Sequence, residues 1–271
     1  MGVRTLAGFT IIETMLFLGI SSALVVALIA GTGASLNTQR YNDAVQSFKS
    51  VLQQQYSELT SVQNNRDNNW SCGSNAVPST TGTTSQIRGQ SNCMLIGKYM
   101  RLEDNKISIY TVIGYEKANT SSESNDITSL KNNYVLSLSR VNVDKNTLEW
   151  GTQIAYPATD GGAAYFKPAN PRKMAILFVR SPDSGQIYTL TSSDDSVPDD
   201  EDSIGSGTLA SMLVSGPGIP GQGSRLICVD SGGLLSNANR GIKLRAFAAT
   251  GSAVETVSND YLAKNGDPLR C

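Results

Sequence analysis

The sequence predicts an α+β protein in which one long N-terminal helix carries a globular head built mostly of antiparallel β-strands. An uninterrupted apolar run over residues 9–30 leads into an amphipathic stretch that reaches residue 62. Short runs rich in β-branched and aromatic residues, separated by turn signals, follow in residues 63–271. We therefore expect a short leading segment over residues 1–8, a helix over residues 9–62 and a head over residues 63–271.

The apolar run over residues 9–30 is long enough to cross a membrane. At roughly 1.5 Å per residue it forms a helix of about 30 Å, which is the thickness of bilayer hydrocarbon. One charged residue, Glu13, stands near its start, and no Lys, Arg or His follows within the run. A carboxylate inside hydrocarbon costs about 2.5–3.5 kcal/mol on insertion scales. We therefore expect the partner of Glu13 to come from another chain.

The residues around Glu13 resemble the N-terminus of type IV prepilins and of the pseudopilins of type II secretion. The resemblance rests on a short leader that contains Arg4, on the sequence Gly8-Phe9-Thr10-Ile11-Ile12-Glu13 and on the apolar stretch behind it. It is specific over residues 4–30 and only architectural beyond them. It implies that a prepilin peptidase removes residues 1–8 by cutting after Gly8, and that Phe9 becomes an N-methylated amino terminus.

Cleavage after Gly8 would create an ammonium group at Phe9, which also needs a partner in an apolar medium. Glu13 of a neighbouring subunit could supply it, and such a pair would fix the stagger between chains. The resemblance thus implies a subunit held in the inner membrane and then assembled, by a pilus assembly platform, into an extracellular filament with copies of itself or other pilins. The alternative is a plain signal anchor whose Glu13 is hydrated near the membrane interface.

The chain departs from the family in one respect, because many members have a proline in this segment and here none precedes Pro78. Gly31 and Gly33 stand near the corresponding place. Because glycine weakens a helix by up to about 1 kcal/mol, they suggest either local melting of the helix or close packing against a neighbour.

The second half of the expected helix carries an apolar stripe in alternating steps of four and three residues. The simplest interpretation is that the head of the same subunit rests on this stripe. Contacts of Tyr41 and Tyr56 with neighbouring helices of a filament are the alternative. The stripe consists of Tyr41, Val45, Phe48, Leu52, Gln55, Leu59 and Val62.

The head contains eight runs that predict strands and three polar or Gly/Pro-rich segments that predict loops. The predicted strands are residues 94–102, 106–115, 134–141, 147–156, 174–180, 186–191, 225–229 and 242–248. The predicted loops are residues 74–92, 118–126 and 192–223. Alternating apolar and polar residues over 106–112 and 242–247 predict sheets with one solvent-exposed face.

All four cysteines follow the apolar run and are therefore expected in the compartment to which the head is exported, where disulfides form. Three pairings are open. We favour Cys72 with Cys93, closing the polar loop between them, and Cys228 with Cys271, tying the chain end to a strand. A metal site is the less favoured alternative, because the chain has no histidine and no Cys-x-x-Cys spacing.

The absence of histidine excludes Ser-His-Asp and Cys-His nucleophile systems, and the Gly-rich stretches lack a phosphate-binding pattern. We therefore expect no enzyme and no cofactor. The net charge of -1 offers no reason to expect a nucleic-acid partner. An acidic cluster raises the hypothesis of a calcium site, but a solvated loop is favoured because the spacing does not fit an EF-hand and Pro198 interrupts it. Its four calcium candidates are Asp199, Asp200, Glu201 and Asp202.

Two classes of function fit these observations. The first is a structural subunit of a type IV pilus-like filament that supports adhesion or motility, with a minor pilin or a pseudopilin of a type II secretion or DNA-uptake system as its nearest variants. The second is a signal-anchored extracytoplasmic binding protein that never polymerises, against which Glu13 argues.

Overall fold

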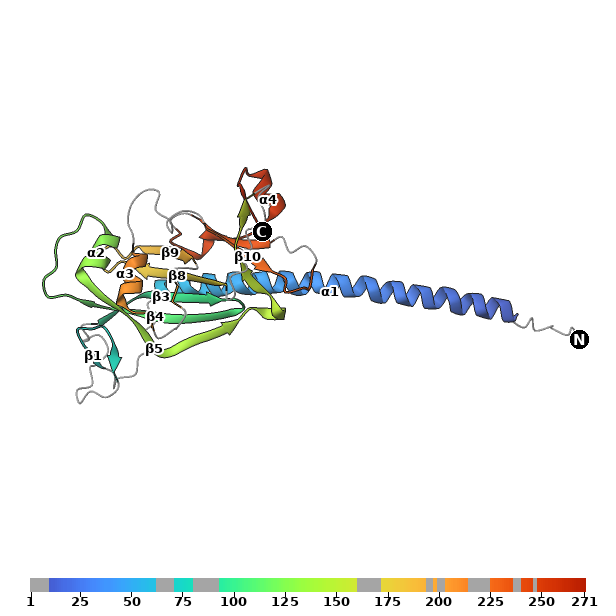
Figure 1. Cartoon of the computed structure of the whole chain (residues 1–271), viewed down its shortest axis with the longest axis horizontal. Helices are drawn as coiled ribbons and strands as arrows, with labels where there is room; N and C mark the ends of the chain where they lie inside the picture. Colours follow the sequence, from blue (N-terminus) through green and yellow to red (C-terminus); the bar gives the residue numbers. More distant parts are fainter. Residues whose placement is uncertain are drawn as a thin grey trace, which may run out of the picture.

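The computed structural model describes residues 10–61, 71–79, 93–159, 172–193, 197–198, 203–213, 225–235, 240–245 and 248–271. Its dominant element is helix α1 (Ile11–Ser61), which is 51 residues long. The N-terminal half of α1 projects from the head, and the C-terminal half lies along it (Figure 1). The predicted α+β class and the long helix are both confirmed. Phe9 and Val62, the expected ends of the helix, lie outside the described residues.

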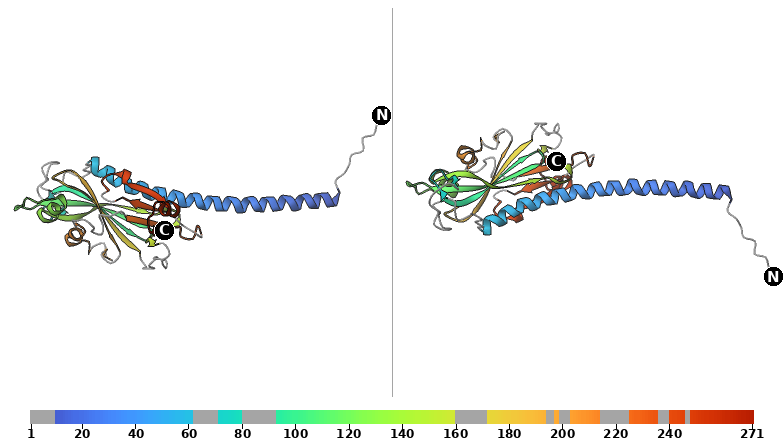
Figure 2. Two further views of the ribbon diagram at one scale, coloured as in Figure 1. Left: turned by 90° about the horizontal axis from the view of Figure 1, so that it is seen from above. Right: turned by 90° about the horizontal axis from the view of Figure 1, so that it is seen from below.

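Helix α1 is continuous through Gly31 and Gly33, the two residues with the lowest helix propensity in this part of the sequence. Figure 2 shows it as one gently curved rod that leaves the head at one end. Its last turn is closed by groups from the head and from its own side chains. Arg180 Nη1 lies 3.5 Å from the carbonyl oxygen of Leu59, and Thr60 Oγ1 donates to the carbonyl of Tyr56 at 2.8 Å. The carbonyl of Leu59 is one of the last four of α1, which have no intrahelical donor, so Arg180 supplies the partner that it lacks.

The head is built on a five-stranded antiparallel sheet of order β5-β4-β3-β8-β9. Its strands are β3 (Cys93–Glu103), β4 (Lys106–Glu116), β5 (Tyr134–Thr147), β8 (Lys173–Arg180) and β9 (Ile187–Ser193). Two short helices, α2 (Asp126–Asn133) and α3 (Ser206–Met212), contribute to a core on the face that α1 does not cover.

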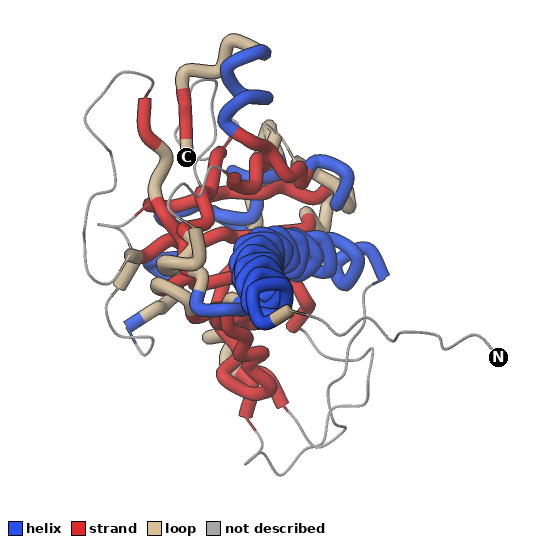
Figure 3. Tube along the Cα trace, turned by 90° about the vertical axis from the view of Figure 1, so that its right-hand side faces the viewer, coloured by secondary structure: helices blue, strands red, loops and turns tan. Residues whose placement is uncertain are grey.

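A second antiparallel sheet has the order β12-β11-β10-β6 and also contacts α1. Its strands are β6 (Gln153–Ala155), β10 (Arg225–Asp230), β11 (Arg240–Leu244) and β12 (Val254–Ser258). Two small sheets pair β1 (Ser71–Cys72) with β2 (Pro78–Ser79), and β7 (Ala158–Thr159) with β13 (Leu269–Arg270). Helix α4 (Asn259–Lys264) follows β12. Seen along α1, strands of the head lie above and below the helix (Figure 3).

The apolar stripe of α1 is buried by the head of the same chain, as the sequence predicts. Burial of one large apolar side chain contributes about 1.5–3 kcal/mol, so the stripe fastens α1 firmly to both sheets. Tyr41 and Tyr56 are each 2 % exposed and bond to the head, so the alternative that they contact neighbouring helices is wrong. The buried members of the stripe are Tyr41, Val45, Phe48, Leu52, Gln55 and Leu59.

The prediction of one solvent-exposed sheet face is wrong for β4. Ile107 and Ile109 join the core beneath α1, whereas Tyr110 and Val112 join a second core beneath α2 and α3. The pairing with β5 also shifts between Ile109 and Thr111, which breaks the simple alternation. The other face is covered by α2 and α3, two helices that the sequence analysis does not predict.

The remaining differences concern short elements. The predicted strand over residues 147–156 is interrupted, because β5 ends at Thr147 and a 3-10 turn, Glu149–Gly151, precedes β6. The predicted loop over 192–223 contains α3, and the loop over 118–126 ends where α2 begins. Strand β12 and helix α4 have no counterpart in the prediction. Most of the predicted loop over 74–92 lies outside the described residues.

Candidate functional site

The N-terminal half of α1 is the candidate functional site, because it presents a long apolar surface that the head does not touch. Ile11, Phe17 and Leu28 are 75 %, 70 % and 68 % exposed. Tyr41 is the first buried residue among those of α1 whose side chains are described. This half of the helix is long and apolar enough to span a membrane. Such a surface is unfavourable in water, so it needs either lipid or other apolar helices to cover it.

Two side chains close the first turn of α1. The backbone N–H of Thr10 donates to Glu13 Oε2 at 3.0 Å, and the Thr10 hydroxyl lies 3.1 Å from the same oxygen. In return, the backbone N–H of Glu13 donates to Thr10 Oγ1 at 3.3 Å. This is a capping box, in which the residue before the helix and the third helical residue satisfy each other's backbone donors.

The capping box gives Glu13 a hydrogen-bond partner that the sequence analysis did not consider. The expectation itself concerns a cationic partner, and Thr10 supplies hydrogen bonds but no positive charge. The spacing Thr-x-x-Glu at the start of an apolar run is a known signal for this motif and could have revealed it. Over the described residues no Lys or Arg forms an ion pair with Glu13, and the first charged residue after it in the sequence is Arg40. The charge of Glu13 is therefore hydrogen-bonded but not neutralised.

The predicted cleavage site lies outside the described residues, since these begin at Thr10 and exclude both Gly8 and Phe9. The calcium candidates Asp199, Asp200, Glu201 and Asp202 also lie outside them. In the described part of the chain, no group of three or more Cys, Asp or Glu residues is placed to hold a metal ion.

Tyr41 fixes the point where α1 leaves the head. Its hydroxyl lies 2.9 Å from the carbonyl oxygen of Val229 and 3.2 Å from that of Arg240, and it accepts a hydrogen bond from the Arg240 N–H at 3.1 Å. Burial raises the pKa of this hydroxyl, so it stays protonated and able to donate. Tyr41 thereby joins the helix to β10 and β11, and the projecting half starts from a fixed position.

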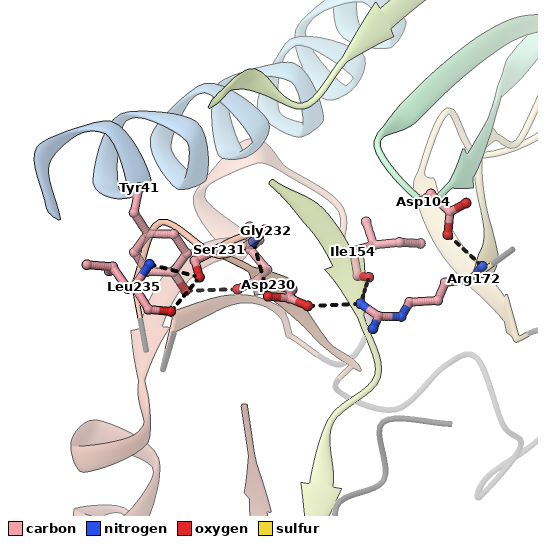
Figure 4. Close-up of polar contacts among 9 residues, drawn as sticks. Tyr41, Asp104, Ile154, Arg172, Asp230, Ser231, Gly232 and Leu235 are labelled. Carbon is pink, nitrogen blue, oxygen red and sulfur yellow. Dashed lines mark hydrogen bonds and ion pairs between the residues drawn. The ribbon is translucent and has the colours of Figure 1, made fainter. Parts of the chain in front are cut away.

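A polar network continues from Tyr41 into the second sheet (Figure 4). Arg172 Nη1 donates to the carbonyl oxygen of Ile154 at 3.1 Å and lies 3.3 Å from Asp230 Oδ2. The backbone N–H of Arg172 donates to Asp104 Oδ1 at 2.9 Å. Because Asp104 follows β3 and Asp230 ends β10, this arginine connects the two main sheets beside the helix.

The point of exit also carries an aromatic residue that the sequence argument missed. Trp150 is 51 % exposed, and the guanidinium carbon of Arg40 lies 4.9 Å from the centre of its ring. The backbone of Trp150 is left-handed, with φ of 57°. Arg40 immediately precedes the buried Tyr41, and the turn Glu149–Gly151 that carries Trp150 contacts α1. We call Arg40 and Trp150 the neck pair.

Two disulfides stabilise the head, in the pairing that the sequence favours. Cys72 is bonded to Cys93, with Cα atoms 6.0 Å apart, and joins the β1–β2 hairpin to β3. Cys228 is bonded to Cys271, with Cα atoms 5.3 Å apart, and ties the last residue to β10. Both bonds are far along the chain from the projecting half of α1.

A cleft of about 440 Å³ lies between the β1–β2 hairpin, β5 and the start of α3. Val77 and Val141, which are 45 % and 37 % exposed, line it with Leu138 and Ile204. Among the described residues of its lining, Arg140 is the only charged one. That lining therefore brings together no acid–base pair.

Comparisons of this chain with protein families, with curated proteins and with solved structures find no match.

Proposed function

We propose that this chain is a pilin-type subunit, which is drawn from a membrane pool and polymerises through α1 into a type IV pilus-like filament. The observation that carries the proposal is the projecting half of α1, which is apolar, continuous with the rest of the helix and not covered by the head. A lipid bilayer and a bundle of identical helices would both cover this surface. The same segment can therefore serve a stored membrane form and an assembled form.

Glu13 explains why assembly would be favoured over storage. In the membrane its carboxylate is held by Thr10 but has no cation beside it in the described chain. Removal of residues 1–8 by a prepilin peptidase would create the ammonium of Phe9, which the same enzyme would methylate. Pairing of Glu13 with Phe9 of a neighbouring subunit neutralises two charges in an apolar interior, and separating such a pair typically costs about 3–5 kcal/mol.

The head has the features of the outer layer of such a filament. It is attached to α1 by the stripe around Phe48 and by the bonds of Tyr41, so each head would follow its own helix into the assembly. The two disulfides suit the oxidising compartment outside the inner membrane. A pilus assembly platform in that membrane would be the partner that extracts the subunit.

Co-expression of a Glu13→Val variant with the wild-type chain tests the proposal. Removal of the charge makes α1 more apolar, so we expect normal membrane insertion and normal processing. We expect the variant to be strongly under-represented in sheared filaments relative to the membrane pool, because the Phe9 ammonium would enter the filament core unpaired. Equal proportions in the two fractions would show that Glu13 is not an assembly contact.

A further inference from the structure

We propose that the neck pair, Arg40 and Trp150, is a lipid-headgroup contact that seats the head on the outer surface of the membrane before assembly. The proposal rests on the proposed membrane-anchored form, because it requires α1 to span the bilayer. It adds a ligand class, the phosphate and glycerol region of phospholipids, for two residues at the exit point of α1 that the filament proposal does not use.

The spacing of charges along α1 places Arg40 at the membrane surface. Arg40 is the first charged residue after Glu13, and no charge lies between them. At roughly 1.5 Å per residue, the two residues are about 40 Å apart along the helix axis. The hydrocarbon of a bilayer is about 30 Å thick, and the bilayer with its headgroups is about 40–45 Å thick. When Glu13 lies just inside the inner edge of the hydrocarbon, Arg40 therefore lies about 10 Å beyond its outer edge, at the outer side of the headgroup layer.

The side chain of Arg40 has a favourable direction for this contact. Side chains of a helix point back toward its N-terminus, which for α1 is the membrane end. Leu36 lies one turn nearer the membrane on the same face and is 50 % exposed. The apolar surface of α1 thus continues up to Arg40, where the first positive charge can meet a lipid phosphate.

Trp150 is presented at the same level by a rigid turn. Its ring lies against the Arg40 guanidinium, and half of its surface is open to solvent. Tryptophan is enriched at membrane interfaces because its ring is apolar and its indole N–H is polar. Its left-handed backbone conformation is strained for a bulky residue and is more favourable for Gly or Asn. A turn with only a structural role would therefore favour one of those residues over an exposed tryptophan.

The turn that carries Trp150 is fixed on two sides. The side chain of Ser47, on α1, lies within 3.3 Å of Glu149 Oε1. On the other side, a Cβ at Gly232 would come within 2.1 Å of the Gly151 carbonyl oxygen, so the β10–β11 connection packs directly against this turn. Trp150 therefore cannot swing away from the exit point of α1 without disturbing both contacts.

Depth-dependent fluorescence quenching tests the proposal on the full chain. The protein, with the other tryptophan replaced by Trp70→Phe, is reconstituted into vesicles of equal parts phosphatidylcholine and phosphatidylglycerol. The phosphatidylcholine carries bromine either near the headgroup or near the end of the acyl chain. We expect Trp150 emission to be lost mainly with the shallow bromines and little with the deep ones. Arg40→Gln should reduce the shallow quenching.

Two further variants, both made in a Trp70→Phe, Trp150→Phe background, serve as controls. Val77→Trp places a probe on the β1–β2 hairpin, at the end of the head away from the projecting helix (Figure 1), and should not be quenched by either lipid. Phe17→Trp places a probe inside the apolar half of α1 and should be quenched by the deep bromines.

The controls separate failure of this inference from failure of the proposed function. Quenching of Phe17→Trp without quenching of Trp150 would overturn the headgroup contact and leave the membrane-anchored subunit intact. Absence of quenching for Phe17→Trp would show that α1 does not enter the bilayer, which would overturn both proposals.

Discussion

Glu13 and Thr10 satisfy each other's backbone donors at the first turn of α1, through bonds of 3.0 Å from the Thr10 N–H and 3.3 Å from the Glu13 N–H. Glu13 therefore has a local structural role as a helix cap as well as the proposed role as an assembly contact. The cap needs an oxygen acceptor at this position, whereas assembly needs a negative charge. The two roles can be separated by substitution.

The first prediction compares Glu13→Gln with Thr10→Val. Glutamine can replace glutamate in a capping box, so Glu13→Gln keeps the cap and removes the charge. Thr10→Val keeps the charge and removes the capping hydroxyl, at a cost of about 0.5–2 kcal/mol in helix stability. We expect filaments from Thr10→Val and almost none from Glu13→Gln, as measured in sheared fractions. The reverse order would mean that Glu13 acts only as a cap.

The second prediction concerns the disulfides. In the entropic account, the Cys72–Cys93 bond, with a separation of 21 residues, contributes about 3 kcal/mol, and the Cys228–Cys271 bond, with a separation of 43, contributes about 4 kcal/mol. Cys228 is also 1 % exposed, so its removal disturbs packing. Two double variants each remove one disulfide by Cys→Ala substitution. In urea unfolding, the variant without Cys228 and Cys271 should lose more free energy of unfolding than the variant without Cys72 and Cys93. Non-reducing peptide mapping that finds crossed pairs or free thiols would refute the pairing.

The third prediction concerns the hydroxyl of Tyr41. Tyr41→Phe leaves the buried groups around it without their partner, at a cost of about 1–3 kcal/mol in the free energy of unfolding. Tyr261→Phe is the matched control, because Tyr261 is 48 % exposed. Removal of its hydroxyl should change the free energy of unfolding by less than about 0.5 kcal/mol. Equal effects of the two substitutions would show that Tyr41 does not fasten α1 to the second sheet.

The fourth prediction concerns alkaline pH. Burial raises the pKa of Tyr56 and of Tyr99 to about 12, whereas the unfolded value is about 10. The unfolded chain therefore loses these protons first, and the stability that the neutral hydroxyls contribute is lost as the pH rises from about 10 to about 12. Each tyrosine should add a slope of up to about 1.4 kcal/mol per pH unit in this window. When the free energy of unfolding is measured by urea titration at several pH values, Tyr56→Phe and Tyr99→Phe should each show a flatter dependence on pH between about 10 and about 12. An unchanged dependence would show that these hydroxyls do not cause the loss of stability.

The elements that the sequence predicts best are those with long periodic patterns. The stripe from Tyr41 to Leu59 repeats over five turns, and its burial depends only on the presence of a head on one side. Strands such as β8, where every residue from Lys173 to Val179 is buried, are recognisable as continuous apolar runs.

The elements that it misses are short or depend on contacts far along the chain. In β12 the two buried valines, Val254 and Val257, are three residues apart, so the strand shows no alternation. Helix α2 is polar, and its start is marked only by the Asn125 side chain, which accepts a hydrogen bond from the Thr128 N–H at 2.9 Å. The neck pair joins residues from α1 and from the turn after β5, a proximity that no local pattern encodes.

The candidate site divides in the same way. The apolar run and Glu13 are evident from the sequence, because both are local features. That the head leaves the described part of this run uncovered, and that Tyr41 marks the boundary, follows only from the packing of α1 against two sheets.

The fifth prediction concerns processing. Because Gly8 is the small residue at the proposed cleavage site, Gly8→Glu should leave the full-length chain in the membrane and produce no filaments. Immunoblots of membrane and sheared fractions provide the measurement. A variant of normal mature length, present in filaments, would refute the site.

The identity of the mature amino terminus tests the central claim most directly. Mass spectrometry of the N-terminal peptide from the membrane-extracted protein distinguishes the two classes of function without reference to assembly. The proposal predicts a chain that begins with N-methylated Phe9. A mature chain that retains Met1 and residues 2–8 would contradict it and would favour a signal-anchored protein that does not polymerise.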